Sequence, residues 1–364
     1  MVPVSVIFSA HNENIYKKKT NIITLYSQIR EYNFGNCLQS YALNAVLEKM
    51  GVENKLVCFK SSGIRKKLSK AKSIVLRRNL QSLKREKIYN TFYRNINVIY
   101  KNASKMRYKK NTYYICGSDQ IWNPSFAGAP EFFAYGADNA RRIAYAASVG
   151  VDELSEDTKK RYSEYLQGMK CISVREDAAA KLVHEMTGKN IPVLCDPTML
   201  LSKREWEAVS KKPGFKTDKY ILTYFLGEAS PEYKDYISAL AESLRCEVIN
   251  LERMKPNDYW YSVGPAEFIW LINHCLLMCT DSFHGSVFSI LMRKPFLVFE
   301  RLENEMPMNS RLDTLLKKTG LKSRVFVGQT LEEAVNIDYK NVSEIIEGEK
   351  EKAIDYLKDA LGVI

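Results

Sequence analysis

Short apolar segments alternate with helical segments along most of this chain, and this alternation constrains the fold more than any other feature. Strands joined by helices form parallel sheets that are covered on both faces. The pattern therefore predicts an α/β fold. The predicted strands are 21–26, 53–59, 112–116, 142–148, 171–174, 191–195, 220–226, 246–251, 275–280 and 295–300. The predicted helices are 36–50, 156–169, 176–186, 230–244, 265–273, 284–293 and 341–362.

The length of 364 residues favours two domains, since a domain typically has about 100–200 residues. The alternation of strands and helices restarts after residue 198, which places the boundary there. We expect an N-terminal extension over 1–20, an N-terminal Rossmann-like domain over 21–198, a C-terminal Rossmann-like domain over 199–345, and a C-terminal helix over 346–364 that can pack back on the first domain.

A segment at about 60–110 carries most of the positive charge. It holds seventeen Lys and Arg residues and one acid, Glu86, so its charge is +16, whereas the net charge of the whole chain is +12. Its apolar residues recur mostly at helical spacing, which predicts one or two amphipathic basic helices inserted into the first domain. Two interpretations stay open: a helical insertion that packs one face and solvates its charges, or a surface for an anionic partner such as a membrane, a phosphorylated substrate or nucleic acid.

The chain lacks the signals of membrane and secreted proteins. No run reaches the roughly 18 apolar residues of a membrane span, and the N-terminus does not read as a signal peptide. The eight cysteines are scattered and mostly lie in apolar runs, which is typical of buried free thiols. No group of residues has the spacing of metal ligands, so we expect no metal and a cytoplasmic protein.

Unusual polar residues gather where predicted strands end and helices begin. In open α/β sheets, ligands bind beyond the carboxyl ends of the strands. These loops therefore predict a binding rim distributed over both domains. The candidate residues are Asn36, Asp119, Gln120, Asn123, Arg175, Asp281, Ser282, His284, Arg301, Asn309, Ser310 and Arg311.

Most of these residues also have a purely structural interpretation. Asn36 can cap its helix, and Asp196 can serve as a turn residue. Arg175 can form a surface salt bridge, or its planar fork can hold a carboxylate or phosphate at two points. His284 lies at a strand-to-helix junction, where a helix N-terminus favours anions and an imidazole can give or take a proton.

Several of these loops together resemble the polysaccharide pyruvyl transferase family. The matching segments are "NFGNCLQSYAL", "GSDQIWNP", "SVRE", "LCDPTMLL", "TDSFHGSVFSILMRKPF" and "MNSRLDTLL", in an order and spacing that cover residues from about 21 to about 320. The resemblance implies a fold like that of the GT-B glycosyltransferases, with two Rossmann-like domains whose parallel sheets face a central cleft. It also implies that pyruvate passes from phosphoenolpyruvate to two hydroxyls of a sugar as a cyclic ketal.

The resemblance implies His284 as the acid or base and Arg175 as a donor anchor, with Arg301 the nearest match to a further basic position. The chemistry of the donor adds Arg311, because phosphoenolpyruvate carries a carboxylate and a phosphate that need cations. We expect Asp281 to orient His284 and Ser282 to help bind the donor. The acceptor or cleft residues are then Asn36, Asp119, Gln120, Asn123, Asn309 and Ser310.

Phosphoenolpyruvate is expected as a co-substrate, with no further cofactor. The implied acceptor is a sugar of a polysaccharide or of a polyprenyl-diphosphate-linked oligosaccharide, made for a cell-surface glycan. Segment 60–110 would then hold a peripheral enzyme at the anionic inner face of the membrane. The alternative is a GT-B glycosyltransferase with a nucleotide-sugar donor. Nucleic-acid binding is disfavoured, because the charge sits in one insertion without a known nucleic-acid motif.

Overall fold

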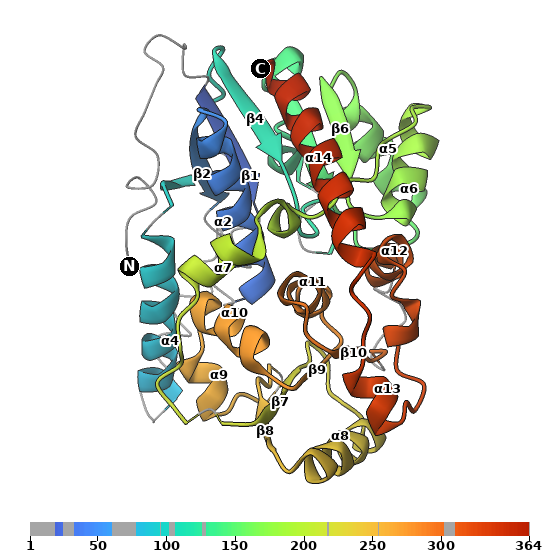
Figure 1. Ribbon diagram of the computed structural model, residues 1–364. Helices are drawn as coiled ribbons and strands as arrows, with labels where there is room; N and C mark the ends of the chain where they lie inside the picture. Colours follow the sequence, from blue (N-terminus) through green and yellow to red (C-terminus); the bar gives the residue numbers. More distant parts are fainter. Residues whose placement is uncertain are drawn as a thin grey trace. The chain divides into compact units, whose positions relative to one another are not determined.

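The chain divides into two compact units (Figure 1). The first consists of Met1–Lys70, Asn90–Leu201 and Glu349–Ile364, and the second of Ala71–Tyr89 and Ser202–Gly348. The structure is a computed structural model that describes residues 19–24, 33–59, 78–94, 96–101, 106–125, 129–216, 218–253, 255–301 and 310–363.

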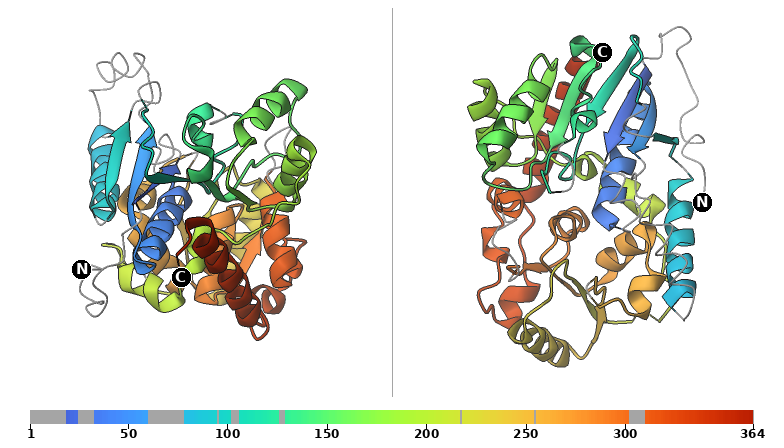
Figure 2. Two further views of the ribbon diagram at one scale, coloured as in Figure 1. Left: turned by 90° about the horizontal axis from the view of Figure 1, so that it is seen from above. Right: turned by 180° about the vertical axis from the view of Figure 1, so that it is seen from behind.

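The first unit contains a six-stranded, all-parallel sheet in the order β3-β2-β1-β4-β5-β6. This is the strand order of the dinucleotide-binding Rossmann fold. The order reverses between β1 and β4. Figure 2 shows the sheet from two further directions. The strands are β1 (Lys19–Thr24), β2 (Glu53–Phe59), β3 (Val98–Lys101), β4 (Thr112–Cys116), β5 (Arg142–Ala147) and β6 (Cys171–Val174).

The helices of the first unit supply most of its remaining core. Residues 34–47 of the first helix are all buried, so this helix crosses the interior rather than lying on the surface. Asn33 caps it by accepting a hydrogen bond from the Asn36 amide at 3.0 Å, so Asn36 is not the cap. The helices and single turns are α2 (Phe34–Lys49), η3 (Pro130–Phe133), η4 (Asn139–Arg141), α5 (Glu156–Leu166), α6 (Asp177–Thr187) and η5 (Pro197–Leu200).

The C-terminal helix α14 (Val342–Leu361) contributes its residues from Glu349 onward to the first unit. The hydroxyl of Tyr356 donates to the carbonyl of Ala144 in β5 at 2.7 Å, and Lys170 donates to the carbonyl of Ala360 at 2.8 Å. The last turns of α14 are therefore hydrogen-bonded to β5 and to the residue just before β6.

The second unit contains a four-stranded parallel sheet in the order β10-β9-β7-β8, with β7 (Tyr220–Tyr224), β8 (Glu247–Asn250), β9 (Leu277–Thr280) and β10 (Phe296–Val298). One apolar cluster includes side chains from three of these strands, such as Ile221, Leu277 and Leu297, and from the helix after β7. The helices and single turns are α7 (Lys203–Val209), α8 (Pro231–Leu244), α9 (Asp258–Ser262), α10 (Pro265–His274), α11 (Phe283–Met292), α12 (Ser310–Thr319), η6 (Lys322–Arg324) and α13 (Leu331–Val335).

Helix α4 (Arg78–Tyr93) belongs to the basic insertion, and its residues up to Tyr89 are part of the second unit. Buried Arg85 donates to the backbone carbonyls of Trp260 and Val263, and its guanidinium lies 3.7 Å from the centroid of a Trp260 ring. Ile88 packs so closely on Gly264 that an added Cβ there would lie 2.1 Å from the isoleucine methyl group. The insertion was predicted as part of the first domain, but α4 docks on the region of α9 and α10.

Replacing Arg85 with alanine is expected to destabilise the second unit. The change leaves two carbonyls with fewer donors and removes the stack on Trp260, a loss of about 3 kcal/mol. Urea unfolding of the variant measures this loss. The neighbouring exposed residue gives the matched control, since Glu86→Ala should change stability by less than about 0.5 kcal/mol. Equal stability of the two variants would contradict the docking role of Arg85.

The predicted α/β fold class with two parallel sheets is confirmed, and the strands predicted at 53–59, 112–116 and 171–174 have those bounds. The strand predicted at 191–195 is wrong, because Val193 forms only an isolated bridge with Val174. Pro192 has no N–H to extend the ladder. Strand β3 was missed because it follows the basic helix inside a segment read as helical. The strand predicted at 21–26 begins two residues earlier, at Lys19.

The described part of the insertion is helix α4, strand β3 and the residues just before β4, while 60–77 lies outside the described residues. Among the helices that the structure describes, none is both long and apolar enough to cross a membrane.

Candidate active site

The strand order of the second unit reverses between β7 and β9, and the candidate residues after β9 lie at this point. Tyr224 at the end of β7 is in register with Thr280 at the end of β9. The loops that follow the two strands are therefore neighbours. Such a reversal opens a crevice at the carboxyl ends of the strands, where ligands bind in folds of this kind.

Asp281 ties these two loops together. Its carboxylate accepts hydrogen bonds from the Leu226 amide at 2.6 Å and from the Gly227 amide at 2.9 Å, both after β7. It also accepts one from Nε of Arg301 at 2.9 Å, after β10. A Cβ on Gly227 would lie 2.9 Å from Cγ of Arg301, so only glycine fits there without movement. The role of Asp281 in orienting His284 stays a prediction, and in the structure three other donors bond this carboxylate.

His284 lies in the first turn of α11 and is 5% exposed. Ser282 caps this helix by accepting from the Gly285 amide at 3.3 Å, and the Ser282 amide donates to the Thr280 hydroxyl at 3.0 Å. The ring of His284 meets that of Phe283 edge to face, with 5.2 Å between centroids. The cap and the strand thus fix an imidazole where the helix dipole favours a negative charge. Ser282, predicted to bind the donor, is seen here as the helix cap.

Arg301 keeps one side of its guanidinium available. Its Nε and Nη2 atoms donate to the carboxylate and the carbonyl of Asp281, whereas within the described part of the chain no acceptor bonds to Nη1. Ser310 begins α12, and Arg311 next to it is 6% exposed. Asn309 lies outside the described residues. The assignment of Arg301 to donor binding stays a prediction, and its partner in the structure is Asp281.

A pocket of about 370 Å³ lies beyond the carboxyl ends of β7 and β8. It shares Gly227 with the Asp281–Arg301 cluster, and its wall combines the apolar ring of Phe225 with polar side chains such as Thr223, Asn250 and Glu252. Apolar walls with a few fixed polar groups are typical of small-molecule sites. Sequence reasoning missed this loop after β7, although a glycine directly after a buried strand was the available signal.

In the first unit, the loop Gly117–Asn123 follows β4, one of the two strands where the order reverses. Asp119, Gln120 and Asn123 are all buried. Gln120 adopts a left-handed backbone conformation with φ of 50°, and its side-chain oxygen accepts from Nδ2 of Asn123 at 3.1 Å. A residue other than glycine in this conformation is strained, and such strain is concentrated at functional sites.

Arg175 grips two carboxylates, but they belong to this chain rather than to a ligand. Nη1 donates to Asp196 at 2.6 Å and Nη2 donates to Asp119 at 3.1 Å, while the side chain is 1% exposed. Burial by itself lowers the pKa of the guanidinium, but the charges of Asp196, Asp119 and Glu176 outweigh burial and raise the pKa. Arg175 therefore fastens the loop after β4 to the turn η5.

The same network extends to α2 and α6. The Ser118 hydroxyl lies 3.1 Å from Asp196, and the Ser118 amide donates to the side-chain oxygen of Gln39 at 3.3 Å. Glu176 accepts from the amides of Val149 and Gly150 at 2.9 and 3.0 Å. These hydrogen bonds tie the loop after β4 to α2 and to the turn η5.

Asp196 has the turn role considered from the sequence and a second role that the sequence did not predict. One carboxylate oxygen accepts from the Thr198 amide at 2.9 Å as a turn residue would, and the other pairs with Arg175. Asn36 is fully buried, and its side-chain amide has no hydrogen-bond partner among the described residues.

The candidate residues thus form two groups. Asn36, Asp119, Gln120, Asn123 and Arg175 lie in the first unit, and the remaining described ones lie in the second. The predicted cleft between domains stays a prediction. Among the described residues, no group of three or more His, Cys, Asp or Glu side chains could hold a metal ion.

The family model for polysaccharide pyruvyl transferase matches residues 33–303, about three quarters of the chain. The chain belongs to the polysaccharide pyruvyl transferase family. The match covers the loop Gly117–Asn123, the Arg175 network and the Asp281–Arg301 cluster of this pyruvyl transferase. A search of curated proteins found no match.

Several solved structures are similar to this pyruvyl transferase. The N-terminal domain of trehalose-6-phosphate phosphatase from Candida albicans has a TM-score of 0.45 at 10% identity, over 95% of this chain and 99% of that one. The glycosyltransferase of kitacinnamycin has a TM-score of 0.43 at 10% identity, over 94% and 99%. The UDP-GlcNAc 2-epimerase from Methanocaldococcus jannaschii has a TM-score of 0.42 at 10% identity, over 93% and 99%.

Proposed function

We propose that this pyruvyl transferase moves pyruvate from phosphoenolpyruvate to two hydroxyls of a sugar, as a cyclic ketal. One observation carries the proposal: His284, an acid–base side chain, lies three residues after Asp281, whose carboxylate fixes Arg301 at the carboxyl edge of the sheet. An anionic donor that must be protonated needs a cation and a proton donor at one place.

The reaction follows from the chemistry of the donor. A proton from His284 adds to the methylene carbon of phosphoenolpyruvate, which becomes a methyl group and leaves an oxocarbenium-like centre at the neighbouring carbon. One sugar hydroxyl adds there and returns its proton to His284. The bond to phosphate then breaks, the second hydroxyl adds, and its proton leaves with the phosphate. Each ketal therefore releases one inorganic phosphate.

The cations divide between the two anionic groups of the donor. We assign Nη1 of Arg301 and the guanidinium of Arg311 to its carboxylate and phosphate. The N-terminus of α11 adds a favourable field for the same charges. Arg175 has a positioning role instead, since its fork is held by Asp119 and Asp196.

The acceptor is a sugar of a polysaccharide or of its lipid-linked precursor. The pocket beyond β7 and β8 supports this class, because it joins an aromatic ring to amide, hydroxyl and carboxylate groups that can bond sugar hydroxyls. A cytoplasmic location and attachment to the inner membrane face through segment 60–110 both stay predictions.

The test is an incubation of the full chain with phosphoenolpyruvate and a library of glycan and lipid-linked acceptors, followed by mass spectrometry and a phosphate assay. We expect a pyruvyl mass gain on one acceptor and an equal amount of phosphate. The same pocket could instead hold the nucleotide of a sugar donor. Consumption of a nucleotide sugar with a hexose mass gain, and no use of phosphoenolpyruvate, would replace this proposal by that of a glycosyltransferase.

A further inference from the structure

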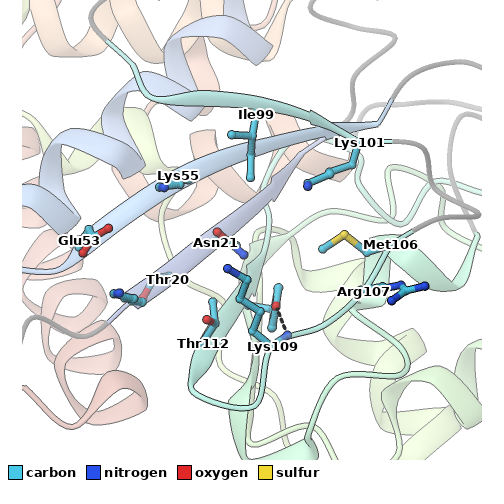
Figure 3. A pocket seen from close by; sticks show the side chains of 12 residues that line it. Thr20, Asn21, Glu53, Lys55, Ile99, Lys101, Met106, Arg107, Lys109 and Thr112 are labelled. Carbon is cyan, nitrogen blue, oxygen red and sulfur yellow. Dashed lines mark hydrogen bonds between the residues drawn. The ribbon is translucent and has the colours of Figure 1, made fainter.

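A second pocket, of about 310 Å³, lies in the first unit on one face of β3, β2, β1 and β4. Figure 3 shows Lys55 and Lys101 on neighbouring strands and Arg107 on the segment before β4. The pocket is separate from the candidate active site, since none of its lining residues belongs to the loop Gly117–Asn123 or to the second unit.

The strand register explains why these side chains share one face. Asn21 in β1 is in register with Lys55 in β2 and with Tyr114 in β4, and side chains two residues apart on a strand point to the same side. Lys19, Glu53 and Thr112 line the pocket at the amino ends of β1, β2 and β4, whereas Lys101 is the last residue of β3 and is in register with Phe59. The pocket therefore extends obliquely across this face of the sheet.

The pocket concentrates positive charge. It is lined by five cationic side chains and one acid, Glu53, which gives a charge of +4. Within the described residues, no carboxylate forms an ion pair with any of the five cations. They are Lys19, Lys55, Lys101, Arg107 and Lys109. Like charges repel one another, so a chain that gathers them without acids gains most when an anion binds.

The segment before β4 contacts Tyr114 of β4 and forms one side of the pocket. The Lys109 amide donates to the Tyr114 hydroxyl at 2.8 Å, and the rings of Tyr108 and Tyr114 meet edge to face with 5.0 Å between centroids. This segment is the end of the basic insertion. The described part of the insertion is therefore divided between docking on the second unit through Arg85 and lining an anion pocket through Lys101, Arg107 and Lys109.

We propose that this pocket binds a diphosphate group. The charge of +4 exceeds what one carboxylate requires and suits the two to three negative charges of a diphosphate. Lysines bind phosphate as point charges, and Arg107 adds a planar fork. A volume of about 310 Å³ is at the small end of ligand pockets, and the apolar walls of Ile99 and Met106 leave room for an uncharged group joined to the diphosphate.

The inference does not depend on the proposed reaction. The probe is inorganic diphosphate, titrated into the full chain by calorimetry. Lys55→Ala and Arg107→Ala should each weaken binding about tenfold, which corresponds to one charge-assisted contact of about 1.4 kcal/mol. The matched control is Lys181→Ala, an exposed lysine of α6 outside the pocket, which should leave the affinity unchanged.

Two further arms identify the site and the source of the diphosphate. Saturating phosphoenolpyruvate should not displace inorganic diphosphate, because the donor site lies elsewhere. Flotation with phosphatidylcholine vesicles, with and without diacylglycerol diphosphate, asks whether the diphosphate is carried by a lipid. If Lys55→Ala abolishes vesicle binding as well, the ligand is lipid-borne; if only the soluble probe binds, it is free. Absence of diphosphate binding, equal binding by Lys55→Ala and Lys181→Ala, or displacement by phosphoenolpyruvate would each overturn the proposal.

Discussion

Replacing His284 with alanine is expected to lower turnover of phosphoenolpyruvate by about 10²–10⁴-fold, the contribution of a placed proton donor. Because the imidazole lies in the first turn of α11 and its backbone is held by the Ser282 cap, the variant should keep its fold. Initial rates of phosphate release measure the effect. Added imidazole should restore part of the rate, since it can enter the space that the side chain leaves.

The matched control is His274→Ala. This exposed histidine stacks on Trp270 at the end of α10 and lies outside the cluster of Asp281 and Arg301. Its variant should retain full turnover. If His284→Ala were nearly as active as His274→Ala, or if its loss were matched by a loss of folded protein, the acid–base role would be wrong.

Breaking the Arg175 network is expected to cause the second large effect, a loss in the free energy of unfolding. Replacing Asp196 with alanine leaves a buried guanidinium with one fewer carboxylate, and removing one partner of a buried pair typically costs about 3–5 kcal/mol. Urea unfolding should show this loss. Hydrogen exchange should rise in the loop Gly117–Asn123, which the network fastens to η5.

Two further variants separate the causes of that loss. Asp196→Asn keeps an oxygen that can accept from the Thr198 amide but removes the charge, so it should be destabilised less than the alanine variant. Asp152→Ala, at an exposed acid of the same unit, should change stability by less than about 0.5 kcal/mol. A small effect of Asp196→Ala would show that Arg175 does not depend on this carboxylate.

The sequence predicted where functional side chains gather because that prediction needs only local patterns. A buried strand, a polar loop and a helix start can each be recognised within about ten residues. The rule that ligands bind at the carboxyl ends of the strands then predicts which loops carry the functional side chains. The bounds of strands β2, β4 and β6 were predicted correctly. Asp119 and Arg175 follow β4 and β6, so the prediction placed them at one edge of the first sheet.

The partners of those side chains could not be read in the same way. Arg175 meets Asp196 from 21 positions away and Asp119 from 56 positions away, so the pairing depends on the folded sheet. Asp281 is held by the amides of Leu226 and Gly227, which have no side-chain signature. For Asp281 and Arg175, predicted as orienter and donor anchor, the structure shows charged partners within the chain that local sequence patterns do not reveal.

The basic insertion shows the same limit. Its composition predicted amphipathic helices and left open whether they pack on the domain or face an anionic partner. It did not predict that Arg85 would be buried against Trp260 or that strand β3 would begin at Val98. Burial of a cation depends on carbonyls supplied from about 175 residues away. The pocket formed by Lys19, Lys55 and the end of the insertion likewise exists only once the strands are in register.

The most direct test of the account is the reaction run in heavy water with phosphoenolpyruvate and the acceptor identified by the library screen. If His284 delivers a solvent-exchanged proton to the methylene carbon, each ketal formed should carry one deuterium in its methyl group, and one phosphate should be released with it. Mass spectrometry of the product counts that deuterium. A ketal without deuterium would contradict the proton transfer, and an acceptor that gains a hexose from a nucleotide sugar instead of pyruvate would contradict the reaction itself.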